Sequence, residues 1–125
     1  MKNLIHAFPS YSTDQIEESL HFYKEILGFE VQLKLEAFLH VQITEDTTLI
    51  IYYKANYEAA GHTVLNLQVT NIRQVVTDLS DAGIKFLQYP PPIETDAQGI
   101  SWDEEGSHLA WFKDPGGNII ALIEN

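Results

Sequence analysis

Hydrophobic and polar positions follow one plan twice along the chain. In the first half, a short apolar run at residues 3–8 has the length and composition of a strand. A helix should follow it, marked by an N-cap signal (Asp14 with Glu17), an apolar stripe (Ile16, Leu20, Tyr23 and Leu27) and a terminal glycine (Gly28). Three strand-like runs then cover residues 29–35, 38–44 and 48–53.

The second half repeats this order. Residues 63–70 read as a strand, and Asn71 is placed to cap a helix over 72–82 that Gly83 ends. Further strands are expected at residues 84–89, 108–113 and 118–124, with a proline-rich connection over 90–106. The pattern therefore predicts an α+β protein of two βαβββ repeats, at about 1–57 and 62–125, within one domain covering 1–125.

The net charge of the chain says more about its ligands and partners than the rest of its composition does. The chain is 45% hydrophobic and has a formal net charge of −11. Such a surface repels phosphate backbones and favours cationic ligands, so we expect no nucleic-acid partner. No apolar run is long enough to span a membrane, and the lack of cysteine fits a reducing compartment. These features predict a cytoplasmic protein without a membrane partner.

Two motifs resemble a known family. The stretch "SLHFYKEILGFEV" is similar to the first-helix signature of the vicinal oxygen chelate superfamily, and "AWFKDPGGNIIALIE" is similar to its closing hairpin. The superfamily includes glyoxalase I, extradiol dioxygenases, and the fosfomycin and bleomycin resistance proteins. The resemblance implies a cupped mixed sheet of two βαβββ modules around a cleft, and a homodimer. It leaves the activity open, because this fold hosts many chemistries.

Metal-dependent members of this superfamily hold a divalent ion with a His on the first strand, a Glu on the fourth, a His on the fifth and a Glu on the last. The positions that match in this sequence are His6, Ile51 or Tyr52, Val64 and Ala121. One of four ligands survives, whereas a stable site needs three or four converging donors. We therefore expect no cofactor. A shift of one or two residues in this assignment would leave a His6–His62 pair, which keeps a divalent metal as the alternative.

Strand alternation and the resemblance together predict which residues face the cleft. The candidate ligand-binding residues are His6, Phe8, Tyr52, His62, Val64, Asn66, Gln68, Trp102 and Ala121. Simpler roles compete with this one, since His6 suits a hydrogen-bonded core histidine, while Asn66 and Gln68 suit a solvent-facing sheet. Trp102 stands apart because it lies in an acidic loop with Asp103, Glu104 and Glu105, where an aromatic ring can pack against a cation.

Two functions remain open on the sequence. The first is a small-molecule-binding protein that has lost most metal ligands of the family and sequesters a cationic or aromatic compound. The second is a lyase, isomerase or dioxygenase of the superfamily, either metal-dependent or using His6 as a catalytic acid or base. Aliphatic side chains at two ligand positions favour binding over catalysis, because they remove the donors that Lewis-acid chemistry requires.

Overall fold

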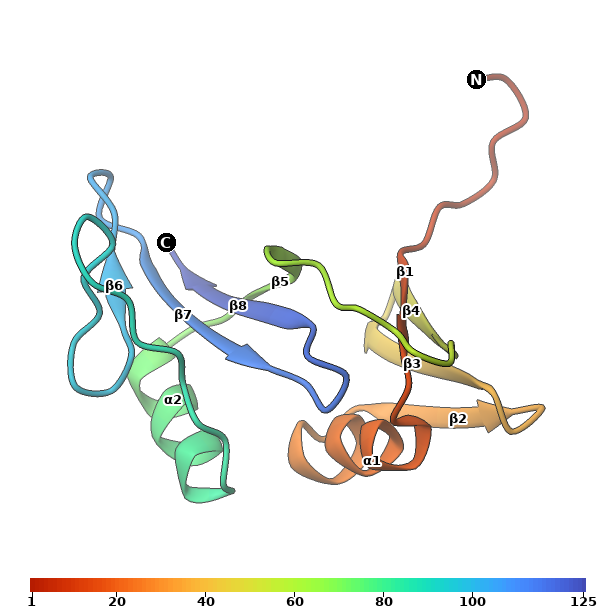
Figure 1. The fold of residues 1–125 in the computed structure, drawn as a ribbon. Coiled ribbons are helices and arrows are strands. Elements are labelled where there is room, and N and C mark those ends of the chain that lie inside the picture. Colours follow the sequence, from red (N-terminus) through yellow and green to blue (C-terminus); the bar gives the residue numbers. More distant parts are fainter. The chain divides into compact units, whose positions relative to one another are not determined.

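The computed structural model describes all 125 residues and divides the chain into two compact units, Met1–Glu58 and Ala59–Asn125 (Figure 1). Both units have the predicted βαβββ order, and each contains one four-stranded mixed sheet. Sheet 1 has the strand order β1-β4-β3-β2, and sheet 2 has the order β5-β8-β7-β6. In each sheet the first strand of the unit pairs in parallel with its last strand. The prediction of a two-module α+β fold is confirmed.

Unit 1 contains four strands and one helical segment. The strands are β1 (Ser10–Thr13), β2 (Glu30–Lys34), β3 (Phe38–Thr44) and β4 (Thr47–Tyr53), and the helix α1 (Ile16–His21) continues as the π-helical turn η1 (Phe22–Ile26). The helical segment covers one face of sheet 1 through contacts with β2 and β3. Buried apolar side chains from both layers form the core there: Tyr11, Phe22, Tyr23, Leu39, Val41, Leu49 and Ile51. The hydroxyl groups of Tyr11 and Tyr23 lie 2.5 Å apart inside this core.

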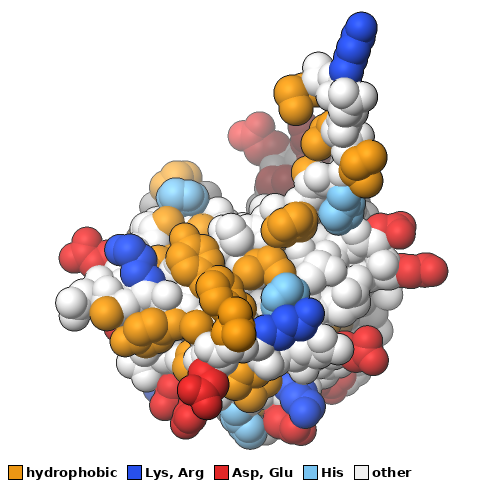
Figure 2. All heavy atoms as spheres, turned by 90° about the vertical axis from the view of Figure 1, so that its right-hand side faces the viewer, with side chains coloured by type: hydrophobic (Ala, Val, Ile, Leu, Met, Phe, Trp, Pro, Cys, Tyr) orange, Lys and Arg blue, Asp and Glu red, His pale blue; other side chains and the backbone are white.

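The first strand begins later than predicted. Residues 3–8 belong to no strand, and β1 starts at Ser10. Pro9 explains the limit: its carbonyl accepts the N–H of Ile50, but proline has no N–H to return and it also restricts the backbone of Phe8. Residues 1–9 form an exposed arm that leads away from β1 and carries hydrophobic side chains (Figures 1 and 2).

The start of α1 also differs from the prediction. Gln15, rather than Asp14, is the N-cap residue, and no side chain caps it. The side-chain oxygen of Thr13 accepts the N–H of Gln15 at 3.0 Å and the hydroxyl of Ser19 at 3.2 Å. Thr13 therefore fixes the turn between β1 and α1, where Asp14 was expected to act as the N-cap.

Unit 2 contains β5 (Thr63–Gln68), α2 (Ile72–Asp81), β6 (Ser101–Trp102), β7 (His108–Lys113) and β8 (Ile119–Glu124). Helix α2 packs on β7 and β8 and covers one face of sheet 2. The predicted strand at residues 84–89 does not form. Its N–H groups are used elsewhere, because Ile84 donates to Leu79 at the helix end and Tyr89 donates to the Thr95 hydroxyl. Only the N–H of Leu87 reaches β7, at the carbonyl of Trp111, and the two-residue strand β6 takes the edge position.

The N-terminus of α2 is held by the last strand. Asn71 is the N-cap residue as predicted, but its backbone is left-handed and its side chain makes no cap. Both oxygens of the Glu124 carboxylate accept N–H groups instead, from Asn71 at 2.6 Å and from Ile72 at 3.0 Å. These N–H groups have no partner within a helix, so the carboxylate satisfies two free donors and joins β8 to α2.

This contact should make stability depend on pH. The N–H groups of Ile72 and Asn71 hold the pKa of Glu124 below its ordinary value of 4.5. A lowered pKa in the folded state means that the ionised carboxylate stabilises the protein above pH 4.5, and that this stabilisation disappears as the pH falls through the folded-state pKa. We expect Glu124→Gln to lower the melting temperature at neutral pH, with the difference from the parent protein shrinking in acid. Thermal melts across this pH range test it against Glu105→Gln, an exposed control, and a difference independent of pH would contradict it.

None of the helices is long and apolar enough to cross a membrane.

Candidate functional site

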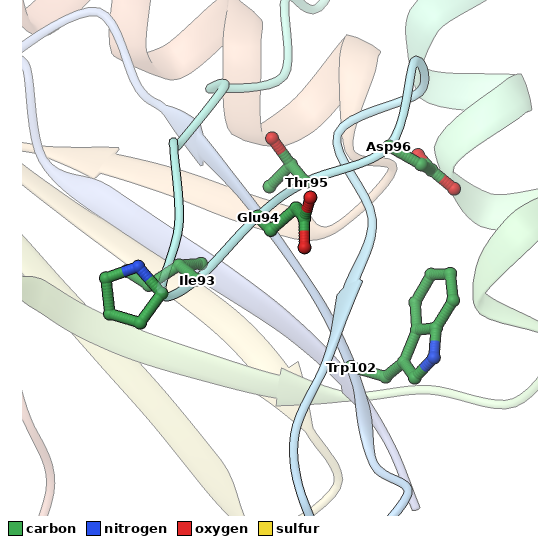
Figure 3. Close-up of a pocket in the computed structure, with 6 residues that line it drawn as sticks. Ile93, Glu94, Thr95, Asp96 and Trp102 are labelled. Atoms are coloured by element: carbon green, nitrogen blue, oxygen red, sulfur yellow. The ribbon is translucent and has the colours of Figure 1, made fainter.

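A pocket within unit 2 lies around Trp102, in the long connection between α2 and β7 (Figure 3). Strand β6 places Trp102 at the edge of sheet 2, opposite His108 in the ladder. The indole is 57% exposed, and its ring is tilted against the His108 ring with centroids 5.6 Å apart. An aromatic ring with this exposure is available to a ligand.

Two adjoining cavities share Pro92, Ile93 and Trp102. The first, of about 440 Å³, is completed by Glu94, Thr95 and Asp96. The second, of about 330 Å³, is completed by Ser101, Asp103, Glu104, Leu109 and Trp111. Volumes of this size are typical of small-molecule sites, as is the mixture of apolar walls and a few polar groups.

Hydrogen bonds fix the walls of these cavities. The Ser101 hydroxyl donates to the carbonyl of Ile93 at 2.5 Å, which joins β6 to the opposite side of the pocket. Asp96 accepts the N–H groups of Gln98 and Ile100 and pairs with Arg73 of α2 at 3.2 Å. On the other side, the Asp103 carboxylate accepts two loop N–H groups, from Glu105 and Ser107, both at 2.9 Å. The loop carboxylates Asp96 and Asp103 are therefore structural.

The negative charge available to a ligand comes from two other residues, Glu94 and Glu104. Partial burial acts to raise the pKa of Asp96, but hydrogen bonds from the N–H groups of Ile100 and Gln98 and from Arg73 outweigh it, so the pKa stays below its ordinary value. Asp96 is thus ionised, and the guanidinium of Arg73 balances its charge. The side chains of Glu94 and Glu104 form no ion pair. They leave negative charge beside the Trp102 ring.

A second group of predicted residues lies on the face of sheet 2 away from α2. In the ladder Ala121 has Asn66 on one side and Trp111 on the other, so these three side chains share that face. Asn66 and Gln68 are exposed, whereas Ala121 is only 1% exposed. Leu65 and Leu67 alternate onto the opposite face, beside Ile120 and Leu122. The Trp102 pocket reaches this group through Trp111.

Val64 and His62 do not follow the predicted alternation. Thr63 pairs with Ile119 and Leu65 pairs with the next residue of β8, so Val64 is the extra residue of a bulge. Thr63 takes the ladder position beside Ile119 that regular alternation assigned to Val64. His62 is exposed and precedes β5.

The remaining candidate residues of unit 1 lie in two different places, the N-terminal arm and strand β4. His6 and Phe8 lie in the exposed arm, not on a strand, and their rings stack on each other with centroids 6.2 Å apart. This corrects the expectation that they alternate along β1. Of the two fourth-strand positions, Ile51 is fully buried on the helix side, while Tyr52 lies on the other face beside Phe38 and Ser12.

The residues at the family's metal positions do not fit a divalent ion. Within unit 2, the ladder neighbours at the last-strand position are a methyl group, Ala121, and an amide, Asn66. Within unit 1, the fourth-strand position offers an aliphatic side chain, Ile51, or a phenol, Tyr52. No three His, Cys, Asp or Glu side chains are grouped so that they could hold a metal ion. Imidazole, thiolate and carboxylate are the usual donors to such an ion, and none of these four side chains supplies one.

Sequence reasoning identified Trp102 and its acidic neighbours but missed Pro92, Ile93 and Glu94. These belong to the proline-rich connection, whose path cannot be deduced from periodicity. Its length was the available signal, because long connections without secondary structure often carry binding residues.

Comparisons with known proteins agree with this architecture. The family model "Glyoxalase/Bleomycin resistance protein/Dioxygenase superfamily" matches residues 4–122. A search of curated protein sequences gives no significant match. Among solved structures, a member of the same superfamily from Sphaerobacter thermophilus has a TM-score of 0.75 at 20% identity, covering 98% of both chains.

Two further solved structures are similar over nearly their whole length. Lactoylglutathione lyase from Agrobacterium tumefaciens has a TM-score of 0.73 at 16% identity, covering 100% of this chain and 96% of that one. A glyoxalase family protein from Enterococcus faecalis has a TM-score of 0.64 at 24% identity, covering 99% and 98%. These likenesses show a shared fold. With the family match across almost all of the sequence, they establish that the chain belongs to the glyoxalase/bleomycin resistance protein/dioxygenase superfamily.

Proposed function

We propose that this protein binds an organic cation with an aromatic core, in the pocket around Trp102, without catalysing a reaction. One observation carries the proposal: a half-exposed indole forms a wall shared by two adjoining cavities, beside two carboxylates that form no ion pair. The chain's formal net charge of −11 adds a long-range attraction for cations.

The physical chemistry of the pocket suits such a ligand. The face of an indole attracts a cation by about 0.5–2 kcal/mol, depending on how much water is removed. Glu94 and Glu104 add Coulomb attraction, which solvent screens because both side chains are exposed. The apolar walls formed by Ile93, Leu109 and Trp111 offer area to an aromatic body.

The proposal includes the absence of a metal cofactor. It rests on the residues at the family's four metal positions, where Ala121, Val64 and either Ile51 or Tyr52 replace three of the usual ligands and only His6 remains. Metal analysis of protein purified without chelators should give much less than one ion per chain, before and after incubation with zinc, nickel, manganese or iron(II). A stoichiometric transition metal would favour the alternative, an enzyme of the superfamily.

A homodimer is also part of the proposal. Most of the exposed large hydrophobic side chains belong to unit 1, including Leu4, Ile5 and Phe8 in the arm. Covering such side chains in a second copy would remove apolar surface from water. Sedimentation as a monomer at micromolar concentration would remove this part of the proposal.

The binding test uses a fluorescent aromatic cation, N-methylacridinium, and its neutral counterpart acridone. We expect the cation to bind more tightly, and Trp102→Ala to weaken its binding at least about tenfold through loss of the stacking and cation–π contact. Fluorescence titration gives the dissociation constants. Tyr53→Ala, which removes another exposed aromatic ring outside the pocket, is the matched control.

Charge is tested separately in the same assay. Glu94→Gln and Glu104→Gln should each weaken the cation by a smaller factor, with an effect that decreases at high salt, while leaving acridone unchanged. Glu58→Gln is the control for overall charge. Equal binding of cation and neutral compound, or no effect of Trp102→Ala, would overturn the proposed ligand class.

A further inference from the structure

A separate cavity of about 390 Å³ lies within unit 1, near the β2 edge of sheet 1. All but one of its lining residues carry a polar or charged side chain: Lys24, Glu30, Val31, Gln32, His40, Gln42 and Thr48. No residue of this cavity belongs to the ligand-binding set deduced from the sequence.

Strand pairing explains why these polar side chains converge. Glu30, Gln42 and Thr48 form one row across β2, β3 and β4 in the ladder. The adjacent row on the same face places Gln32 beside His40. This face lies opposite the helical layer, since the intervening residues Val41 and Leu49 are fully buried on the other side. Lys24 joins the cavity from η1, around the sheet edge.

One wall of the cavity is fixed by its own hydrogen bonds. The amide nitrogen of Gln42 donates to the carbonyl of Thr44 at 2.7 Å and to that of Glu45 at 3.3 Å. Its amide oxygen accepts the Thr48 hydroxyl at 2.9 Å. Both N–H donors of this amide and one lone pair of its oxygen are used. Gln42 and Thr48 therefore form a pre-organised surface.

The other polar groups are not used by the protein. Lys24 and Glu30 form no ion pair, with each other or with any other charged side chain. His40 is half-buried on β3, yet its imidazole forms neither a hydrogen bond nor an ion pair. The ammonium group of Lys24, the carboxylate of Glu30 and the imidazole of His40 therefore line one cavity without bonding to one another.

We propose that this cavity binds a small zwitterion of the α-amino acid class, with the ligand carboxylate toward Lys24 and its ammonium group toward Glu30. A simple anion would gain from Lys24 but be repelled by Glu30, and the reverse holds for a simple cation. A ligand that carries both charges gains from both residues. His40 and Gln32 supply hydrogen-bonding groups for a polar side chain such as that of glutamine. This inference is independent of the proposed function in unit 2.

The test compares glutamine with two analogues that each lose one charge, glutaminamide and N-acetylglutamine. Isothermal titration or ligand-observed NMR should show glutamine binding at least about fivefold more tightly than either analogue. Lys24→Gln should weaken glutamine and abolish its preference over glutaminamide, because the carboxylate then has no cation to meet. Glu30→Gln should abolish the preference over N-acetylglutamine in the same way.

Controls separate this site from general effects and from the Trp102 pocket. Lys54→Gln and Glu58→Gln change the same charges outside the cavity and should leave all three affinities unchanged. Trp102→Ala should also leave glutamine binding intact, so failure of the aromatic-cation proposal does not affect this one. The inference is overturned if none of the common amino acids binds at about 10 mM, or if both preferences survive the two cavity variants.

Discussion

Alanine in place of Phe112 is expected to lower the free energy of unfolding by about 3–5 kcal/mol. Phe112 is fully buried in β7, on the side of sheet 2 that faces α2, and its ring meets Phe86 edge-to-face with centroids 5.6 Å apart. Truncation to a methyl group loses transfer free energy and leaves a cavity that the neighbouring strands cannot fill.

Equilibrium urea unfolding with two independent probes measures this loss. Phe112→Leu is the matched variant, because it keeps most of the apolar volume, and it should lose about 1–2 kcal/mol. A loss below about 1 kcal/mol for the alanine variant would mean that the core of unit 2 rearranges around the missing ring.

Asp114→Ala should be the second most damaging change, lowering the free energy of unfolding by about 2–3 kcal/mol. The carboxylate is nearly buried at the β7–β8 turn. One oxygen accepts the N–H groups of Gly116 and Asn118 at 3.0 and 2.8 Å, and the other accepts the side-chain amide of Asn118 at 3.0 Å. Alanine leaves these donors without their acceptor, and buried unsatisfied donors are costly.

Calorimetric melting tests the prediction, with Asp114→Asn as the control. Asparagine keeps one acceptor oxygen and the shape of the side chain, so it should retain part of the stability. If alanine and asparagine have equal effects, the charge of Asp114 matters to the turn and its individual hydrogen bonds do not.

Most of the fold could be predicted because the hydrophobic periodicity and the glycine, proline and capping residues at the ends of the elements indicated the same boundaries. Strands β2, β3, β4, β7 and β8 and helix α2 lie within one or two residues of the predicted ranges. The errors have specific causes. Pro9 stops the pairing of the first strand, and Ile84 and Tyr89 donate their N–H groups to the helix end and to Thr95 instead of to a strand. Neither effect is visible in hydrophobic periodicity, which reports burial and not hydrogen-bond partners.

The candidate site was predictable only in part, for a similar reason. Trp102 could be predicted as a binding residue because it lies in an acidic loop, where an aromatic ring can pack against a cation. The bulge at Val64 shows the limit of alternation, since one extra residue changes the face of everything before it. The Glu124 carboxylate at the end of β8 binds the N-terminus of α2, a contact that strand alternation does not predict.

The cavity in unit 1 was missed altogether. Its residues come from η1, β2, β3 and β4, and no spacing in the sequence connects Lys24 with His40 or Thr48. Only the register of three strands brings the rows together, and register follows from burial of the opposite face.

The parallel pairing of the first and last strands in each unit has a consequence for how the chain folds. The partners Ser10–Ile50 and Asn66–Ala121 are roughly 40 and 55 positions apart, so each sheet is completed by one long-range closure. The entropy of such a closure grows only slowly with the length of the loop, but the search for it delays folding. No strand of sheet 1 pairs with a strand of sheet 2. The first sheet can therefore form on the ribosome while the second half of the chain is still being translated, without waiting for a partner strand.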